Sequence, residues 1–536
     1  MAGKPQTLAT TSAFEVLGPV MVGPSSSHTA GALRCAQVAS SLVDGRVASV
    51  RFTLWNSFAH TYRGHGTDRA LVAGVLGLAT DDERIRDAFE LAHASGLDYE
   101  FEVGGDDATM HPNTVDIQMT SESGAQAQVR GESLGGGRVR VSRINGVGVS
   151  VTGRYATLFV AHRDAPGVLA ALANLLAYAH VNIATCRTYR TEQGGQAYSV
   201  FETDGAPAED VLAMVRGLEH VDYATFISLA GAGSAVAPGV TAEELFDDGA
   251  QLLDACEERG LSIGGVMRVR EEALTGSEHA SAAMRRVMEV MREETTVPLA
   301  HPAKSLGGFI GGEGKKVADA GAAYAAGLMG AVQTDAVARA MAVLERSAAM
   351  GVIVAAPTAG SAGVVPGCVL AAADHLGASD DQVAEALFCA AAIGMNIQTG
   401  ACVAGAEGGC QAEVGSAAAM AAAALAQLYG GTPEQALCAS SLAISNLLGL
   451  VCDPVGGLVE VPCQARNAIG VAAAFSSAQL ALSGVESLVP FDEVVHVMSE
   501  VGHALPASLR ETARGGLAAA PSACAACAAH ERPCGR

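Results

Sequence analysis

Three cysteines in the C-terminal half of the chain stand beside glycine and proline, in contexts that present a side chain from a rigid loop. Cys410 lies in "GAEGGCQAEVG", and Cys452 and Cys463 lie in "LVCDPVGGLVEVPCQARN". Proline disfavours a continuing helix, so Pro454 and Pro462 place the second and third cysteines next to turns. The alternative is that all three are small core residues beside turns, because free cysteine is readily buried.

If these thiols bind metal, their number favours an iron–sulfur cluster or a cysteine-rich zinc site. The cysteines lie 42 and 11 residues apart, which matches neither a C-x₂-C zinc ribbon nor a ferredoxin run. Three cysteines fit a four-iron cluster in which one iron is left for another ligand. Such an iron acts as a Lewis acid that polarises a substrate oxygen, so that it leaves as hydroxide or water.

The stretch "GPSSSHTAG" at residues 23–31 is the second candidate for chemistry. Glycine, proline and serine favour turns, so the stretch is a poor interior for a helix or a strand. One interpretation is a solvated loop or a helix N-cap in which His28 has no chemical role. The other is a cradle of backbone N–H and hydroxyl groups for a small anion, with His28 as donor or proton carrier.

Composition and charge limit the partners of the chain. The net charge of −23 argues against nucleic acid or an anionic membrane surface as the main partner. The N-terminus lacks the pattern of a secretory signal. The Ala-rich segments 415–431 and 468–483 are short and interrupted by Gln or Ser, which predicts buried helices rather than membrane spans. The sequence therefore predicts a cytoplasmic protein that binds neither nucleic acid nor membrane.

The cysteines are concentrated toward the C-terminus. The chain has 13 of them, and all but Cys35, Cys186 and Cys256 follow residue 360. Without an export signal, a framework of disulfides is not expected. Some of the later cysteines would be core residues, and a few would be metal ligands.

The elements that must position these residues fall into three regions, beginning with an α+β N-terminal domain over residues 1–153. Within it, "GALRCAQVASSLV" has the apolar face of a helix and "ASVRFTLW" reads as a strand. The alternating stretch "GGGRVRVSRINGVGVSVTG" predicts a strand pair around a turn at Asn145 and Gly146.

The second and third regions differ from the first in pattern. Residues 154–230 predict a βαββαβ domain with a turn at 164–167, and the Gly- and Ala-rich residues 231–240 predict a linker. Residues 241–536 are almost entirely helical in pattern and rich in Ala, the best helix former. We therefore expect a multidomain protein whose C-terminal domain is an all-α bundle of closely packed helices.

Several motifs, taken in order, resemble the iron–sulfur L-serine dehydratases. They are "GPSSSHTAG", "RGHGTD" at 63–68, "GAEGGCQAEVG", "CDPVGG", "VPCQARNA" and "RGGLA". The resemblance covers most of the chain and is to the fused form of the family, in which beta-type and alpha-type parts form one chain. The middle region, with its Asp-x-Pro-Gly turn, resembles an ACT domain, a module that binds small regulatory ligands.

This resemblance implies a reaction and a cofactor. The family removes water from L-serine, and the resulting enamine hydrolyses to pyruvate and ammonia, with a [4Fe–4S] cluster in place of pyridoxal phosphate. Cys410, Cys452 and Cys463 would be the three cluster cysteines. A cysteine near the C-terminus would hold the fourth iron until substrate displaces it. Counting from "RGGLA" selects Cys524, with Cys527 and Cys534 as the alternatives.

The resemblance also implies which residues bind and transform the substrate. Ser25, Ser26 and Ser27, with the N–H groups of their loop, would hold the serine carboxylate, and His28 would donate to it. His65, in "RGHGTD", is the first candidate for proton transfer, because a positioned base must take the weakly acidic α-proton. Each histidine has the alternative role of a hydrogen-bonded structural residue.

Further residues follow more loosely from the resemblance. Lys304 and Ser305, in a Gly-rich loop at 303–316, would contact the substrate carboxylate, and the Gly-rich loop 356–367 would border the site. Arg466 and Asn467 adjoin the third cysteine and would tune the cluster. His111, in "HPNT", is a weaker candidate with an architectural role as the alternative.

The chain departs from the family pattern just before the first cluster cysteine. It has Gly400, Cys402 and Ala404 where the family favours an asparagine and serines. This difference puts the polar network around the substrate in doubt and leaves the cluster cysteines untouched. The ligand of the ACT-like domain would be serine, another small molecule or a monovalent cation, with a vestigial spacer that binds nothing as the alternative. Such modules pair across subunits, which predicts a homo-oligomer.

Three other functions remain open at this point. An amino-acid sensor would bind serine without a cluster or activity. A zinc hydrolase or structural zinc protein would hold zinc in place of iron and sulfide. A pyridoxal phosphate-dependent dehydratase would catalyse the same reaction, although no convincing lysine stands within a motif for that cofactor.

Overall fold

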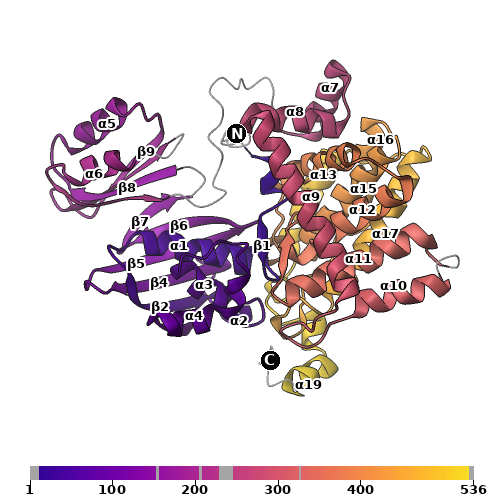
Figure 1. The fold of residues 1–536 in the computed structure, drawn as a ribbon, viewed down its shortest axis with the longest axis horizontal. Helices are drawn as coiled ribbons and strands as arrows, with labels where there is room; N and C mark the ends of the chain where they lie inside the picture. Colours follow the sequence, from indigo (N-terminus) through magenta and orange to yellow (C-terminus); the bar gives the residue numbers. More distant parts are fainter. Residues whose placement is uncertain (1–10, 153–155, 204–207, 228–245, 325–327, 530–536) are drawn as a thin grey trace.

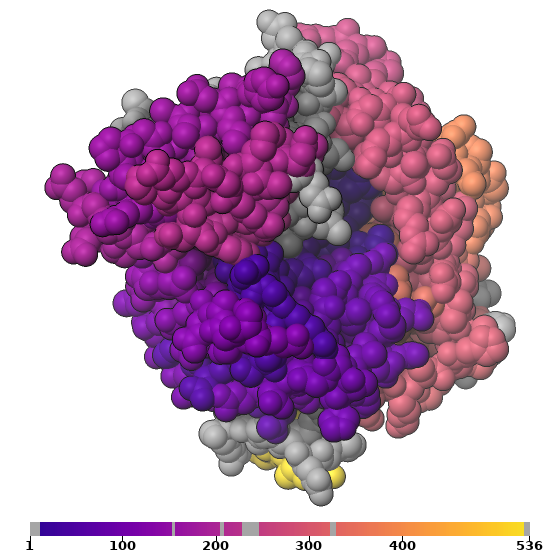
Figure 2. Space-filling view, turned by 60° about the vertical axis from the view of Figure 1, so that its left-hand side comes forward, coloured from indigo at the N-terminus to yellow at the C-terminus, as the bar shows by residue number. Residues whose placement is uncertain are grey.

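The computed structural model describes residues 11–152, 156–203, 208–227, 246–324 and 328–529. Strands dominate the N-terminal half and helices the C-terminal half (Figure 1). The six-stranded and four-stranded sheets lie to one side of a large helical body (Figure 1). In the space-filling view, the magenta residues of the second region lie above the indigo and purple residues of the first (Figure 2). Within the described residues, no helix is both long enough and apolar enough to cross a membrane.

The first region is built on a six-stranded sheet with strand order β3-β2-β4-β5-β6-β7. Strands β2 and β3 are parallel, and every other neighbouring pair is antiparallel. The elements are β2 (Val47–Trp55), β3 (Asp98–Gly105), β4 (Asn113–Ser121), β5 (Gln126–Gly135), β6 (Arg138–Ile144), β7 (Val147–Val151), α1 (Ala32–Ser41), α2 (Asn56–Thr61), α3 (Thr67–Val75) and α4 (Ala88–Ser95). The predicted helix and strands are present, and Asn145 and Gly146 both have positive φ, as a tight hairpin turn requires.

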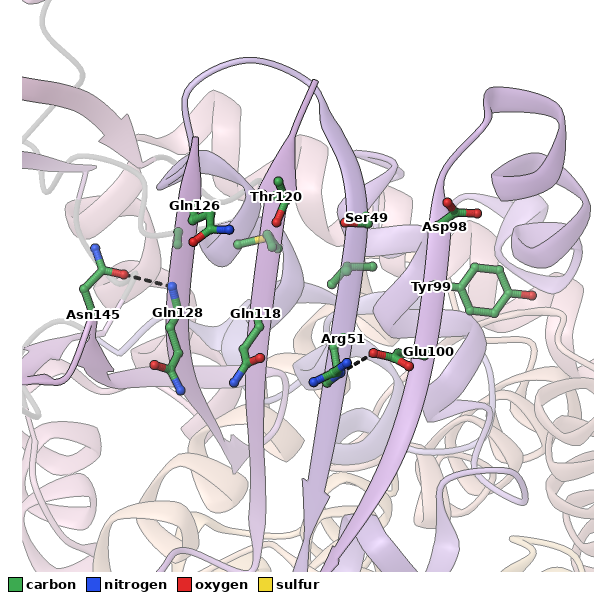
Figure 3. A pocket seen from close by; sticks show the side chains of 13 residues that line it. Ser49, Arg51, Asp98, Tyr99, Glu100, Gln118, Thr120, Gln126, Gln128 and Asn145 are labelled. Carbon is green, nitrogen blue, oxygen red and sulfur yellow. Dashed lines mark hydrogen bonds and ion pairs between the residues drawn. The ribbon is translucent and has the colours of Figure 1, made fainter. Parts of the chain in front are cut away.

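The two faces of this sheet differ in character. Apolar side chains such as Phe52 and Ile117 pack with those of α1 and α3 in one core. The opposite face is polar and forms an open groove of about 770 Å³, where Arg51 pairs with Glu100 (Figure 3). None of the predicted site residues lines this groove.

The second region has the predicted order of elements and a four-stranded antiparallel sheet, β11-β8-β10-β9. Its elements are β8 (Ala156–Arg163), α5 (Val168–Tyr178), β9 (Ile183–Arg190), β10 (Gln196–Thr203), α6 (Glu209–Arg216) and β11 (Val221–Ile227). One face packs on α5 and α6. The other face joins the core of the first region through Phe159 and Tyr198, and the Tyr223 hydroxyl donates to the carbonyl of Ser41 at the end of α1 (2.7 Å). The predicted linker, 231–240, lies outside the described residues.

The helical half surrounds α15, which is buried along nearly its whole length and packs against α12, α13, α16 and α17. Small residues allow close approach: a Cβ on Gly363 would overlap the carbonyl of Ala340. The helices are α7 (Gly249–Arg259), α8 (Ile263–Thr275), α9 (Ser277–Ala300), α10 (Glu313–Tyr324), α11 (Gly330–Ala348), α12 (Val364–Leu376), α13 (Asp380–Gly400), α14 (Gly405–Gly408), α15 (Ser416–Leu428), α16 (Pro433–Ser445), α17 (Cys463–Leu482), α18 (Phe491–Ala504) and α19 (Pro521–Ala529).

The N-terminal segment is tied to this helical half, which corrects the expectation of an all-α domain. Strand β1 (Val20–Val22) pairs antiparallel with β12 (Val352–Val354), a strand of the helical half. The buried carboxylate of Glu271 accepts bonds from the Ser12 hydroxyl and the Ala13 N–H, both at 2.7 Å. A three-residue strand with a partner so distant in sequence leaves no periodic pattern to detect.

Candidate active site

The serine-rich stretch forms a buried helical turn, Ser26–Gly31, that leads directly into α1. Ser25 caps this π-helical turn, because its Oγ accepts the backbone N–H of His28 at 3.0 Å. Gly31 is needed there, since a Cβ would overlap the side chain of Ser133 on β5. Ser26 and Ser27 are also buried, so the solvated loop considered from the sequence is not what forms. A turn rich in poor helix formers is held helical by tertiary packing.

His28 is fully buried and hydrogen-bonded through both ring nitrogens. Its Nδ1 lies 3.0 Å from Ser27 Oγ and 3.3 Å from Ser25 Oγ, and its Nε2 lies 2.9 Å from Ser57 Oγ on α2. The Ser57 hydroxyl donates its one proton to the carbonyl of Glu511 at 3.0 Å. It must therefore accept from His28, which places the ring proton on Nε2 and leaves Nδ1 as an acceptor.

His65 lies against His28, with ring centroids 4.3 Å apart. Gly66, which follows it, adopts a left-handed conformation (φ 65°) and starts α3, so the histidine is presented at the end of a helix. Among the residues that the structure describes, neither ring nitrogen of His65 has a hydrogen-bond partner. Burial lowers the pKa of His65 to about 3, and burial followed by the nearby His65 lowers the pKa of His28 well below its usual value. Both rings are therefore neutral at physiological pH.

Glu511, from the C-terminal part of the chain, completes a cluster with the two histidines. Its Oε1 lies 3.6 Å from His28 Nδ1 and 3.9 Å from His65 Nε2, and the side chain is 5% exposed. Sequence reasoning missed this residue, although it stands three positions before the "RGGLA" motif. Its φ of 56° is unusual for a residue with a side chain.

The Glu511 backbone also binds the loop of the second predicted cluster cysteine. The N–H of Glu511 donates to the carbonyl of Cys452 at 2.8 Å, and the N–H of Cys452 donates to the carbonyl of Leu509 at 2.9 Å. These bonds bring the histidines of the N-terminal half to the cysteines of the helical half. The candidate site therefore lies where the two halves of the chain meet.

The three predicted cysteines converge at the ends of helices. Cys410 follows α14, Cys452 lies in the loop after α16, and Cys463 is the first residue of α17. Each is at most 7% exposed. Burial raises the pKa of all three thiols, to about 12 for Cys410, and each of Cys452 and Cys463 is further raised by charges that include Cys410.

The cysteines are closely packed against Gly405, and the guanidinium of Arg466 places a positive charge beside them. A Cβ on Gly405 would lie 3.2 Å from Cys452 Sγ and 2.7 Å from Glu413 Oε2. The Arg466 guanidinium hydrogen-bonds Cys410, which lowers the pKa of that thiol and partly opposes burial. It also pairs with Asp453 at 2.7 Å. Three convergent thiols beside one arginine are a donor set that fits an iron–sulfur cluster.

Two neighbouring groups that sequence reasoning placed near the site do border it. The Nδ2 of Asn467 donates to the carbonyls of Cys463 (3.0 Å) and Gly360 (2.9 Å), which ties the third cysteine to the Gly-rich loop 356–367. Thr358 of that loop donates to the buried carboxylate of Glu413 at 2.9 Å. Burial raises the pKa of Glu413 to about 7.

The C-terminal cysteines lie on α19, which packs against the loop that follows Cys452. Cys527 is buried, and its Sγ lies 3.0 Å from where a Cβ of Gly456 would stand. Cys524, the first choice from the sequence, is half-buried and lies 3.8 Å from the carbonyl of Ala518. Cys534 lies outside the described residues.

Lys304 and Ser305 lie in another loop than the buried serine-rich turn around His28. The Lys304 side chain is exposed. Ser305 Oγ accepts from the N–H groups of Gly308 and Ile310, within its own loop. The loop is anchored by Glu460, three residues before Cys463, and it contacts that side of the site.

His111 contacts the helical half at a separate point. Its Nε2 lies 3.2 Å from the carboxylate of Glu407, in the short helix α14 that precedes Cys410. This contact links the two halves of the chain, which fits the architectural alternative considered from the sequence.

Comparison with known proteins agrees with this division into halves. Residues 12–143 match the family described as serine dehydratase beta chain, and residues 258–518 match serine dehydratase alpha chain. The L-serine dehydratase of Streptomyces coelicolor is 32% identical and covers 93% of this chain and 96% of its own length.

Relatives with separate chains match one half each. The probable L-serine dehydratase alpha chain of Bacillus subtilis is 43% identical over 52% of this chain and 93% of its own length. The L-serine dehydratase beta chain of Peptoniphilus asaccharolyticus is 40% identical over 41% of this chain and 98% of its own length. The chain therefore belongs to the serine dehydratase family of enzymes, with the beta-type and alpha-type parts fused in one polypeptide.

Proposed function

We propose that this enzyme converts L-serine to pyruvate and ammonia. One observation carries the proposal: His28 and His65 of the beta-type part meet the side chain of Glu511 of the alpha-type part in one buried cluster, and the backbone of Glu511 is bonded to Cys452. A base beside a metal-binding position is what removal of an α-proton and a β-hydroxyl requires. The relatives named L-serine dehydratase support the same substrate.

We propose further that Cys410, Cys452 and Cys463 hold a [4Fe–4S] cluster. When bound, the cluster supplies a Lewis-acidic iron that assists departure of the substrate hydroxyl. Helix α19 would supply the fourth thiolate in the resting enzyme. Cys524 is the first choice for this thiolate, with Cys527 and Cys534 as the alternatives.

The residues of this chain have distinct tasks in the proposed reaction. The Ser25 and Ser27 hydroxyls, with Ser26 and the N–H groups of their turn, bind the substrate carboxylate. His65, neutral and without hydrogen bonds to its ring, accepts the α-proton at a ring nitrogen. His28, held by Ser57, keeps the serine hydroxyls in place. Loss of the proton and hydroxyl leaves an enamine that hydrolyses to pyruvate and ammonia.

The carboxylate contacts predicted for Lys304 and Ser305 stay predictions. Lys304 is exposed and Ser305 bonds within its own loop, so we assign the carboxylate to the serine-rich turn. Arg466 would hold the charge balance of the cluster.

We also propose the domain division 1–153, 154–230 and 241–536, with 231–240 as linker. The strand order of the middle region supports an ACT-like regulatory domain. Its effector would be serine, another small molecule or a monovalent cation, and the enzyme would act as a homo-oligomer in the cytoplasm.

The test is an anaerobic assay of L-serine with purified protein, in which pyruvate and ammonia are measured together. We expect equal amounts of the two products and loss of activity on prolonged exposure to air. Serine binding without product would favour the sensor. Activity that survives aeration and is abolished by borohydride would favour pyridoxal phosphate, and would contradict the proposal.

A further inference from the structure

The Glu511 carboxylate is buried without a permanently cationic partner. The backbone N–H of Ala406 donates to the carboxylate, and among the described residues its Oε2 has no hydrogen-bond partner. Its ion-pair contacts are with two histidines, and among the described residues no lysine or arginine pairs with it. A carboxylate removed from water is costly to leave uncompensated, so a positive group from outside the chain would be bound favourably at this position.

The hydrogen bonds of His28 strengthen this requirement. Because Ser57 donates to the Glu511 carbonyl, His28 carries its ring proton on Nε2 and presents a lone pair at Nδ1. That lone pair and Glu511 Oε1 are 3.6 Å apart, and both are acceptors. In the free enzyme this lone pair accepts from the Ser27 or Ser25 hydroxyl. Once those hydroxyls turn to a bound carboxylate, Nδ1 and Oε1 are two adjacent acceptors, and one charged donor satisfies both.

We infer that Glu511 binds the α-ammonium group of the substrate; this inference rests on the proposed function. An ammonium has three N–H donors, which match the Glu511 carboxylate and the lone pair of His28. The ammonium and carboxylate of an α-amino acid are attached to the same carbon, so their binding groups must be neighbours. Ser25 and Ser27 meet this condition, because both hydroxyls lie within 3.3 Å of His28 Nδ1.

The arrangement also orients the rest of the substrate. The backbone of Glu511 is bonded to Cys452, so a bound ammonium brings the β-carbon to the cysteine side of the site. His65, whose ring nitrogens are unpartnered, is left for the α-carbon. The site would therefore select α-amino acids over carboxylic acids of the same shape that lack the amino group.

The test compares two ligands that differ only in the ammonium, L-alanine and propanoate, neither of which has a hydroxyl to lose. Dissociation constants are measured by anaerobic calorimetry on the full-length holoenzyme and on Glu511→Gln, with iron and sulfide counted in each. We expect Glu511→Gln to raise the dissociation constant of L-alanine by about ten- to a hundredfold, which is the range of a charged hydrogen bond. Propanoate should change by less than about threefold.

Two further variants make the test decisive. Glu407→Gln removes a carboxylate that pairs with His111 at another contact between the two halves. It should change the dissociation constant of neither ligand. Glu511→Asp keeps the negative charge but moves it back by one methylene. This variant takes the place of Glu511→Gln in the comparison if Glu511→Gln loses its iron. Glu511→Asp should weaken the binding of L-alanine by a smaller factor than Glu511→Gln does, and it should leave the binding of propanoate unchanged.

Three results would overturn the inference: equal weakening of both ligands, unchanged binding of L-alanine, or a stoichiometric metal beyond the cluster iron that Glu511→Gln loses. The last would assign the two histidines and Glu511 to a metal ion. Failure of the proposed function is a separate result, because it appears as absence of pyruvate from wild-type enzyme, whatever the ligand comparison gives.

Discussion

His28 Nδ1 and Glu511 Oε1 lie 3.6 Å apart, at the two ends of the chain. The histidine comes from the turn that starts α1, and the glutamate from a segment bonded to the Cys452 loop. Neither half of the enzyme contains both groups. An active site divided in this way explains why the beta-type and alpha-type parts must assemble, whether as one chain or two.

His65 is the proposed base, and its replacement should abolish turnover while the cluster remains. We expect His65→Asn to lower kcat for pyruvate formation by about a hundredfold or more, the usual contribution of a general base. The iron content should equal that of wild type. His93→Asn, at an exposed position on α4 of the same region, is the matched control. Normal kcat in His65→Asn would assign proton transfer to another group.

Gly405 is packed directly against the cysteines. The substitution Gly405→Ala would place a methyl group 2.7 Å from Glu413 Oε2 and 3.2 Å from Cys452 Sγ. Since such contacts force the cysteine loop to shift, we expect reduced iron content and activity in anaerobically purified protein. Gly148→Ala has open space around its Cβ and should keep both. Full iron in Gly405→Ala would mean that the loop tolerates the shift.

Asp106 links the beta-type part to the segment that carries Glu511. Its carboxylate bonds His60 at 2.8 Å and Arg514 at 2.7 Å, and these contacts lower its pKa below 3.8, the hydrogen bond from His60 contributing most. A carboxyl group whose pKa is lower in the folded than in the unfolded state stabilises the fold at every pH above its unfolded-state pKa. This stabilisation is lost as the pH falls through the folded-state pKa.

The pair is half-exposed, so Asp106→Asn should cost no more than about 1 kcal/mol at pH 7. The apparent melting temperature of the variant should lie below that of wild type from pH 7 down to about pH 4. The gap should narrow only in more acidic buffer. Equal melting temperatures of variant and wild type between about pH 5 and pH 7 would show that Asp106 is not stabilised in its charged form.

Tyr223 joins the middle region to α1, the helix that continues from the His28 turn. Tyr223→Phe removes its bond to the Ser41 carbonyl, which we expect to cost about 1 kcal/mol. Amide exchange at the C-terminal end of α1 should become faster, as measured by mass spectrometry. Tyr178→Phe, at an exposed position, should leave exchange there unchanged. If amide exchange at the end of α1 is the same in Tyr223→Phe and Tyr178→Phe, the contact of Tyr223 does not stabilise α1.

Local patterns predicted much of the fold and the chemistry. The period of α1, the alternation of β2 and the Asn145–Gly146 turn depend on neighbouring residues, which a sequence displays directly. The three cysteines were identified by their Gly and Pro neighbours and by their motifs. The motifs also brought His28 and His65 to attention.

The rest depends on contacts between distant residues. Ser57 and Glu511 are 454 positions apart, yet their hydrogen bond determines which nitrogen of His28 carries the proton. The composition of residues 23–31 indicated a loop, but packing against Ser133 keeps the turn helical and buried. Strand β12 depends wholly on pairing with β1. No local pattern contains this information.

The most direct test of the account is a count of iron and acid-labile sulfide in anaerobically purified wild type, Cys410→Ala, Cys452→Ala and Cys463→Ala. Cys368→Ala, a buried cysteine in α12, is the control. The account predicts about four iron and four sulfide per chain in wild type and control, with both cluster and pyruvate formation lost in the three site variants. Full activity without iron, or a Cys410→Ala variant that keeps its iron and activity, would contradict it.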